Sequence, residues 1–176
     1  MHLLSFLKTA VLASFAITSI ALPINTGDVA VDIRGIADKR APPLPTVEEC
    51  KAQLNVASDS TLFYSGPSGY AGKARQAIKA RDYLKAYKIL GQMWKNPSWQ
   101  NQWQNDEQAS KDFFDICSQA LAEASSGTVY VLLPEDKARN WQSGTVWDRK
   151  EWPNIPSNAK VIRINPDNET QETIKG

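Results

Sequence analysis

The fold is decided by residues 105–134, which read NDEQASKDFFDICSQALAEASSGTVYVLLP. Asn105 can cap a helix, acidic side chains follow in its first turn, and Gly127 stands just past its end. Between these ends runs an apolar stripe at helical spacing: Ala109, Phe113, Ile116, Cys117, Ala120 and Ala124. Residues 128–133 are an almost unbroken run of β-forming side chains, which is typical of a strand buried on both faces.

Shorter elements flank this helix and strand. Periodicity and turn residues predict helices at 47–54 and 70–84 and strands at 60–65 and 160–165. Residues 87–91 fit either a continuation of the second helix or a short strand. This alternation predicts an α/β fold, with a small parallel-type sheet packed with helices and preceded by a helical N-terminal segment. The polar tail from Asp167 is expected to fray.

The N-terminal residues read as processing segments. Residues 1–21 contain an apolar run that ends near small residues, as in a secretory signal peptide. Residues 22–40 lack periodicity and end in Lys39-Arg40, which predicts a propeptide removed by a kexin-type protease. An uncut N-terminal arm is the alternative. Residues 41–176 then form a single secreted, extracellular domain.

The charge balance of this domain excludes two classes of partner. Sixteen Lys and Arg side chains accompany sixteen Asp and Glu side chains from Ala41 onward. A nucleic-acid binder would show a basic surface, which this balance does not predict. Binding to a membrane surface is equally unsupported. No apolar run beyond the signal peptide approaches the roughly 20 residues of a membrane span. The domain is expected to be a monomer without nucleic-acid or membrane partners.

Cysteine and histidine narrow the chemistry further. Cys50 and Cys117 are the two cysteines, and in a secreted chain they predict one disulfide; a catalytic thiol is the competing interpretation. The one histidine, His2, lies in the signal peptide. The mature domain therefore excludes Ser-His-Asp and Cys-His catalysis and the ordinary zinc sites, so no metal is expected.

Residues 139–153 gather candidate functional side chains. Three of the six tryptophans lie here, together with the carboxylates Asp148 and Glu151 and several cations. Flat apolar faces beside a few charges suit a pocket for a charged aromatic ligand. We expect a loop at 134–153, at the strand ends where α/β folds bind ligands, with Asp148 as a solvated partner of Arg149. The tryptophans at 94, 99 and 103 are expected to cover the edge of the core.

Four segments in order carry a resemblance to a known family. They are Thr61–Ser65, Phe113–Ala124, Gly127–Leu133 and Thr145–Glu151, the last preceding a Pro-Asn turn and a final strand. This order resembles the ADP-ribosyl cyclase/NAD glycohydrolase family, including its short microbial secreted members. The resemblance covers about residues 60–166.

The resemblance implies roles for particular residues. Glu151 matches the family's catalytic glutamate, which stabilises the ribosyl cation formed when nicotinamide leaves. The matching aromatic positions are Trp147, Phe114 and Tyr64, and Ser65 matches the serine that follows the last of these. Backbone N–H groups around Ser65-Gly66 would meet a diphosphate, with Arg149 and Lys73 as its cations. NAD is the implied substrate, and no cofactor is required.

Three functions follow from these residues. The first is a secreted NAD-cleaving enzyme that uses Glu151, a role suited to a toxin or effector acting on a host. The alternative is a catalytically inactive interaction protein on the same scaffold, which binds a host protein or the cell wall through its tryptophans. The third is a sugar hydrolase that uses Glu151 with Asp148 or Glu135. Independently, Asn168-Glu-Thr170 is an N-glycosylation sequon, consistent with secretion.

Overall fold

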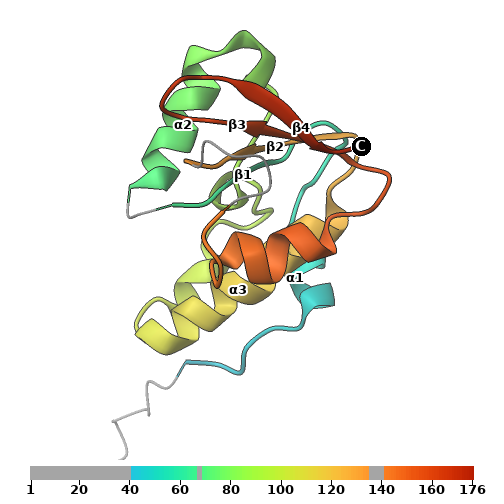
Figure 1. Cartoon of the computed structure of the whole chain (residues 1–176). Coiled ribbons are helices and arrows are strands. Elements are labelled where there is room, and N and C mark those ends of the chain that lie inside the picture. The colour runs from blue at the N-terminus through green and yellow to red at the C-terminus, as the bar shows by residue number, and fades with distance from the viewer. Residues whose placement is uncertain (1–40, 67–68, 135–140) are drawn as a thin grey trace, which may run out of the picture. The chain divides into compact units, whose positions relative to one another are not determined.

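The computed structural model describes residues 41–66, 69–134 and 141–176. Within them, helices pack against a four-stranded sheet (Figure 1). Its strands, in their order across the sheet, are β1 (Leu62–Tyr64), β2 (Thr128–Leu132), β3 (Lys160–Ile164) and β4 (Gln171–Lys175). The predicted α/β class is confirmed. The predicted signal peptide and propeptide lie outside the described residues and stay predictions.

The parallel part of the sheet explains the apolar run at 128–133. β1, β2 and β3 run parallel, so β2 has a strand neighbour on each side. Alternate residues of β2 enter opposite layers of the core: Val129 and Val131 face one layer, and Tyr130 and Leu132 face the other. Because both faces are covered, the four buried positions, 129–132, are apolar or aromatic.

The C-terminal tail does not fray as predicted. β4 pairs with β3 in antiparallel register, and the side chain of Ile174 is buried in the core. The rest of the strand is polar and largely exposed, as is common for an edge strand. One apolar residue among five was too weak a pattern to predict a strand, which forms here because β3 offers a free edge.

The long helix α3 (Glu107–Ala124) supplies one wall of the core. Its N-cap is Asp106, whose carboxylate accepts a hydrogen bond from the backbone N–H of Ala109 at 2.9 Å, so the predicted cap at Asn105 was wrong by one residue. Gly127 follows the helix with a φ of +68°. A Cβ there would lie 2.5 Å from Ser58 Oγ, so glycine allows the turn into β2.

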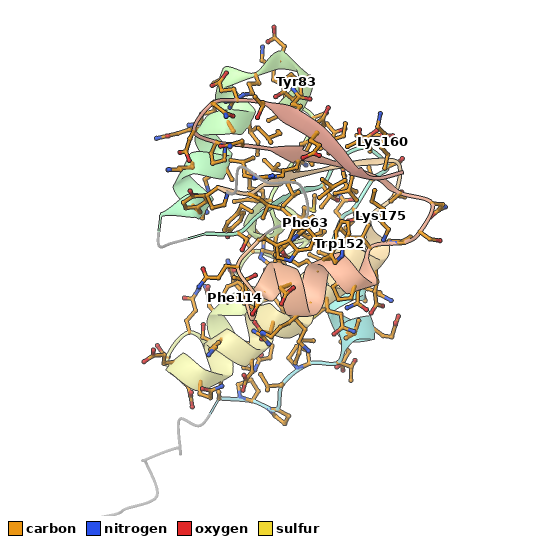
Figure 2. All side chains as sticks on the ribbon, viewed as in Figure 1. Phe63, Tyr83, Phe114, Trp152, Lys160 and Lys175 are labelled. Carbon is orange, nitrogen blue, oxygen red and sulfur yellow. A yellow bond between two sulfur atoms is a disulfide. The ribbon has the colours of Figure 1, made fainter. Side chains whose placement is uncertain are left out.

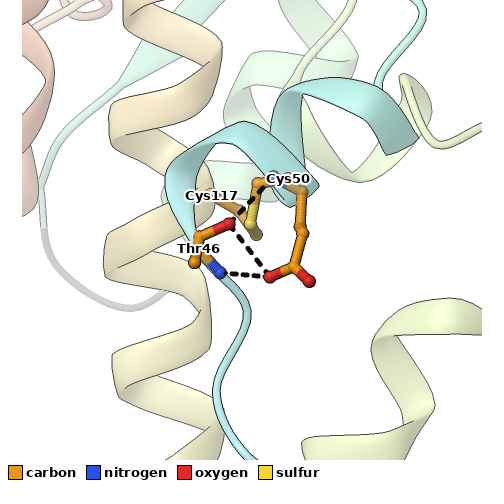
Figure 3. The surroundings of a disulfide bond; sticks show 4 residues. Thr46, Cys50 and Cys117 are labelled. Carbon is orange, nitrogen blue, oxygen red and sulfur yellow. Dashed lines mark hydrogen bonds between the residues drawn. A yellow bond between two sulfur atoms is a disulfide. The ribbon is translucent and has the colours of Figure 1, made fainter.

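The short helix α1 (Val47–Gln53) matches the helix predicted at 47–54. Thr46 and Glu49 form a capping box, in which the Thr46 hydroxyl accepts from the Glu49 N–H and the Glu49 carboxylate accepts from the Thr46 N–H. The predicted disulfide joins Cys50 of α1 to Cys117 of α3, with 5.4 Å between their Cα atoms (Figure 3). Both sulfurs are therefore committed, which removes the catalytic-thiol interpretation.

Residues 70–103 fold into short helical pieces. α2 (Tyr70–Ala80) ends before the predicted position, and the 3₁₀ turn η2 (Asp82–Leu84) follows it. Residues 87–91 form neither a continuation of the helix nor a full strand. Lys88 forms a single parallel bridge to Thr61, and the 3₁₀ turn η3 (Leu90–Gln92) follows. A further turn, η4 (Trp99–Trp103), carries two of the three tryptophans expected at the core edge.

Those tryptophans do surround the edge of the core. Trp103 stacks on Phe113 with 4.5 Å between ring centroids, and Trp94 and Trp99 contact the same phenylalanine. The interpretation as core-edge packing is confirmed. In the described ranges, no helix combines the length and the apolar character that a membrane crossing needs.

Candidate functional site

The segment that carries the predicted site is helical rather than a loop. One π-helical turn, η5 (Trp147–Glu151), continues into the 3₁₀ turn η6 (Trp152–Asn154). Thr145 begins it, since its hydroxyl accepts from the Asp148 N–H and its carbonyl accepts from the Arg149 N–H. The turn packs on α3. The helical form of η5 therefore depends on its packing against α3 and not on a helical pattern of apolar residues in its sequence. Residues 135–140 of the predicted loop lie outside the described residues.

Among the described residues, Asp148 and Arg149 form no ion pair with each other, which corrects the predicted pairing, although the charge of Arg149 still contributes to lowering the pKa of Asp148. The Asp148 carboxylate accepts from Trp141 Nε1 at 3.0 Å and from the Gly144 N–H at 2.9 Å. Both bonds lower the pKa of Asp148, and the bond from Gly144 has the larger effect. Arg149 donates to the Gly144 carbonyl and forms an ion pair with Asp115 of α3 at 2.9 Å. Asp148 therefore fastens the segment from Trp141 to Gly144 to the start of η5, and Arg149 fastens η5 to α3.

A cavity of about 740 Å³ opens beside this segment, within the range usual for ligand pockets. The end of β1, the start of α2, one side of α3 and η5 contribute to its lining. All six side chains predicted for catalysis or substrate binding line it: Tyr64, Ser65, Phe114, Trp147, Arg149 and Glu151. Figure 2 shows Phe63 on the sheet and Phe114 on α3, two aromatic side chains of this lining.

Glu151 lies against the cavity but is shielded from water. The residue is 7% exposed, and its Oε2 atom has no hydrogen-bond partner among the described residues. Burial raises the pKa of Glu151 to about 8, and the charge of Asp115 adds to the rise, while the Ser118 hydroxyl acts in the opposite direction. Glu151 is therefore a buried carboxyl rather than an exposed charged side chain of a loop. In the protein alone, this carboxyl is mostly protonated at pH 7.

The burial of Glu151 predicts a pH-dependent stability. Its folded-state pKa lies above the unfolded value of 4.5, so the folded chain holds the proton more tightly. This contribution is full below pH 4.5 and is lost as the pH rises through about 8. Replacing Glu151 by glutamine removes the titration. Relative to the wild type, the free energy of unfolding of Glu151→Gln is expected to increase by about 2 kcal/mol between pH 5 and pH 7.

Urea unfolding of both proteins at several pH values measures this difference. Glu107→Gln, which changes an exposed carboxylate on α3, serves as the matched control and should follow the wild type. Parallel pH profiles for the wild type and Glu151→Gln would contradict the assigned burial of the charge.

The three predicted aromatic residues differ in exposure. Tyr64 and Phe114 are partly buried and line the cavity. Burial raises the pKa of Tyr64, and the charge of Glu151 adds to the rise. Trp147 is 0% exposed and packs against Phe63 at 5.8 Å, so its ring has no exposed face on which a ligand could stack. It forms the floor below the cavity.

Trp147 also anchors a cluster with the other two tryptophans of this stretch. Trp141 and Trp152 lie 4.9 Å apart and each contacts Trp147. Lys175 of β4 lies over the Trp152 ring at 5.4 Å. Trp141 and Trp152 therefore contribute packing beside the floor of the cavity.

The structure differs from the expected phosphate contacts in two respects. The Ser65 N–H donates to the Leu132 carbonyl of the sheet at 3.0 Å, which leaves only the Ser65 hydroxyl for a ligand. Lys73 is absent from the cavity lining; its ammonium lies 4.6 Å from the centroid of the Tyr70 ring. Arg75, two residues further along α2, lines the cavity instead.

Lys111 and Ser118 of α3 also line the cavity and were missed by the sequence reasoning. Lys111, Phe114 and Ser118 are spaced three and four residues apart, so they share one side of the helix. That spacing could have identified them once Phe114 was placed in the site. No cluster of three or more His, Cys, Asp or Glu side chains suited to a metal ion occurs in residues 41–66, 69–134 and 141–176.

Comparison with known proteins finds similarity to solved structures but no match to a family model or a curated protein. An ADP-ribosyl cyclase complexed with N1-cIDPR matches with 13% identity and a TM-score of 0.42, covering 68% of this chain and 54% of that chain.

Two further solved structures give similar values. The Aplysia cyclase with substrate NGD and product cGDPR shows 14% identity and a TM-score of 0.44, covering 68% of this chain and 54% of that chain. Porcine CD38 with a covalent intermediate, ribo-F-ribose-5'-phosphate, shows 17% identity and a TM-score of 0.41, covering 62% of this chain and 55% of that chain. The chain thus spans about half the length of these proteins, and at such TM-scores the likeness carries no conclusion about its activity.

Proposed function

We propose that this protein cleaves NAD, or a closely related nicotinamide dinucleotide, at the bond between nicotinamide and ribose. The observation that carries the proposal is the Glu151 carboxyl, which is buried, has an unpartnered oxygen and lines a cavity with aromatic and cationic side chains. The order of the four segments that resemble ADP-ribosyl cyclases and NAD glycohydrolases supports the same substrate.

The chemistry of this bond suits a site without histidine. The ribose C1–N bond breaks, and nicotinamide leaves as a neutral molecule, so no general acid is needed. Positive charge develops on the ribose as the bond breaks. A carboxylate beside that carbon stabilises the transition state, especially where water is excluded. Water then adds to the ribosyl cation and gives ADP-ribose and a proton.

Glu151 must lose its proton before it can act in this way. A pyridinium ring in the cavity brings a positive charge near the carboxyl, and this charge favours ionisation most strongly in a poorly hydrated site. Substrate binding and proton release are therefore coupled. The reduced form of the dinucleotide has an uncharged dihydropyridine ring and lacks this contribution, which supports selectivity for the oxidised form.

Three cationic side chains support binding of the diphosphate. Arg75, Lys111 and Arg149 reach the lining from α2, α3 and η5. The guanidinium of Arg149 is already held by Asp115, which fixes its position but weakens its net charge. Among the described residues, Arg75 and Lys111 have no ion-pair partner, so these two are the stronger candidates for phosphate contacts.

Release of nicotinamide from NAD by purified 41–176 tests the proposal directly. A wild-type protein that shows no turnover during long incubation would contradict it, and would leave the inactive interaction protein as the better function. Binding of NAD without turnover is also informative, because it separates a lost reaction from a lost ligand site.

The pH dependence of kcat/KM gives a sharper test. Because Glu151 must be ionised and its pKa in the free protein is about 8, kcat/KM is expected to rise about tenfold per pH unit from pH 5 to pH 7 and to level off above pH 8. The pyridinium charge of NAD does not change over this range. Initial rates at low substrate measure the profile, and a flat profile would contradict an ionised Glu151 as the acting group.

We also propose that the protein acts outside the cell that produces it. The Cys50–Cys117 disulfide supports an oxidising, extracellular setting, in agreement with the predicted signal peptide. An NAD-cleaving protein released from the cell suits a toxin or an effector that acts on a host. Detection of the processed protein in the culture medium of the producing cell tests its export.

A further inference from the structure

The turn between β3 and β4 holds its glycosylation sequon in a defined conformation. The Asn168 side-chain carbonyl accepts hydrogen bonds from the Thr170 N–H at 3.1 Å and from the Thr170 hydroxyl at 2.8 Å. Asn168 and Thr170 are both exposed, and among the described residues the Asn168 Nδ2 has no hydrogen-bond partner. The acceptor nitrogen of the sequon is therefore open to solvent in the folded chain.

The turn is fixed against α2 and the segment that follows it. Glu169, at a φ of 62°, forms an ion pair with Arg81 at the end of α2. Asp167 lies 4.0 Å from the ammonium of Lys73. Asn168 thus lies between two residues that contact Lys73 of α2 and Arg81, so a group attached to Asn168 starts near both.

An exposed aromatic ring lies beside this turn. Tyr83 is 40% exposed, and only Leu44 matches it among the large hydrophobic side chains of the described residues. Its ring packs on Tyr130 at 5.5 Å, and Tyr130 packs on Tyr87 at 4.8 Å. Figure 2 shows Tyr83 beside the start of β4. Arg81, two residues before Tyr83, forms the ion pair with Glu169, so the chain at Tyr83 lies close to the turn. Burial raises the pKa of Tyr83, the charge of Arg81 lowers it and the charge of Glu169 raises it.

We propose that Asn168 carries an N-linked oligosaccharide whose first sugars pack over the exposed ring of Tyr83. Sugars present C–H groups on the faces of their rings, and these groups pack favourably on aromatic rings. The oligosaccharide covers an apolar surface that the polypeptide leaves exposed. The proposal rests on the predicted passage through the secretory pathway, and it does not depend on NAD cleavage.

The covalent step requires a lipid-diphosphate-linked oligosaccharide as co-reactant. Asn168 Nδ2 forms a bond to the anomeric carbon of the first sugar. The bond between that carbon and the diphosphate oxygen breaks, the lipid diphosphate leaves with the electron pair, and the amide nitrogen gives up one proton. The product keeps the side-chain carbonyl that accepts from Thr170.

The geometry of α2 keeps this oligosaccharide away from the cavity. With 3.6 residues per turn, Ala71 and Arg75, which line the cavity, share one side of the helix. Lys73, which contacts the turn, lies two residues from each of them and therefore on another side. Glycosylation is therefore expected to leave the rate of nicotinamide release unchanged.

The modification is tested by secreting the full chain from a yeast host and measuring the mass of the product before and after peptide-N-glycosidase treatment. The wild type is expected to lose an oligosaccharide mass, whereas Asn168→Gln and Thr170→Ala carry none. Asn96→Gln is the matched control, because Asn96-Pro-Ser98 has proline at the position that blocks transfer. A secreted wild type without an oligosaccharide would overturn the proposal.

The packing on Tyr83 needs a second measurement. Enzymatic removal of the oligosaccharide is expected to lower the Tm by about 2–4 °C in the wild type and in Tyr83→Phe, which keeps the ring. In Tyr83→Ala the same treatment is expected to change the Tm by less than about 1 °C. An equal decrease in all three proteins would overturn the contact with Tyr83. Nicotinamide release measured on the same samples keeps this outcome separate from that of the proposed enzyme activity.

Discussion

Replacing Glu151 by glutamine is expected to reduce the rate of NAD cleavage by about 10²–10³-fold or more. The amide has nearly the size of the carboxyl, so the cavity keeps its shape, but it cannot carry the negative charge that opposes the developing ribosyl cation. The buried position of Glu151 strengthens this effect, because water cannot screen the lost interaction. Nicotinamide release at pH 8, where the wild-type carboxyl is half ionised even without substrate, measures the loss.

The controls for this experiment separate chemistry from folding. Glu151→Gln is expected to be at least as stable as the wild type at neutral pH, so a loss of activity cannot result from unfolding. Glu107→Gln removes a carboxylate from the first turn of α3, outside the cavity lining, and should retain full activity. If Glu151→Gln keeps more than about a tenth of the wild-type rate, the charge of Glu151 is not the main source of transition-state stabilisation.

Removal of the Cys50–Cys117 disulfide is expected to lower the free energy of unfolding by about 4 kcal/mol on the chain-entropy estimate. The two cysteines are 67 residues apart, so the bond restricts a long loop in the unfolded chain. Both side chains are fully buried between α1 and α3. A domain of this size is stable by only about 5–15 kcal/mol, so the loss is a large fraction of the total.

Urea unfolding of a Cys50→Ala/Cys117→Ala double variant measures this effect. Replacing both residues avoids a buried free thiol, and alanine is tolerated in the interior of both helices. The m-value is expected to increase, because the unfolded chain without the bond exposes more surface. A decrease in stability below about 1 kcal/mol would contradict the expected role of the bond in holding α1 against α3.

The elements with strong local signals could be predicted from the sequence. α1 has a capping box, α3 has an apolar stripe between an acidic cap and Gly127, and β2 has an unbroken β-forming run. β4 and η5 have no such signal. β4 depends on the open edge of β3, and η5 depends on packing against α3, so both are set by residues distant in sequence.

The candidate site was likewise predictable from the sequence only in part. The order of motifs was enough to select Glu151, Tyr64 and Phe114, which line one cavity. Burial could not be predicted, because exposed and buried carboxylates look alike in a sequence. The same limit applies to Trp147, whose predicted stacking face is covered by its neighbours in the three-tryptophan cluster.

The position of the disulfide has a consequence for the rate of folding. β1 and β2 pair in parallel although they are distant in the chain, with Leu62 opposite Tyr130, and contacts between such distant residues slow the search for the native topology. Cys50 lies 12 residues before Leu62 and Cys117 lies 13 residues before Tyr130, so the disulfide encloses an interval of nearly the same length. Once that bond has formed, the ends of the interval are held together, and much of the entropy of bringing β1 to β2 has already been lost. The crosslink that stabilises the finished domain therefore also shortens the route by which its sheet assembles.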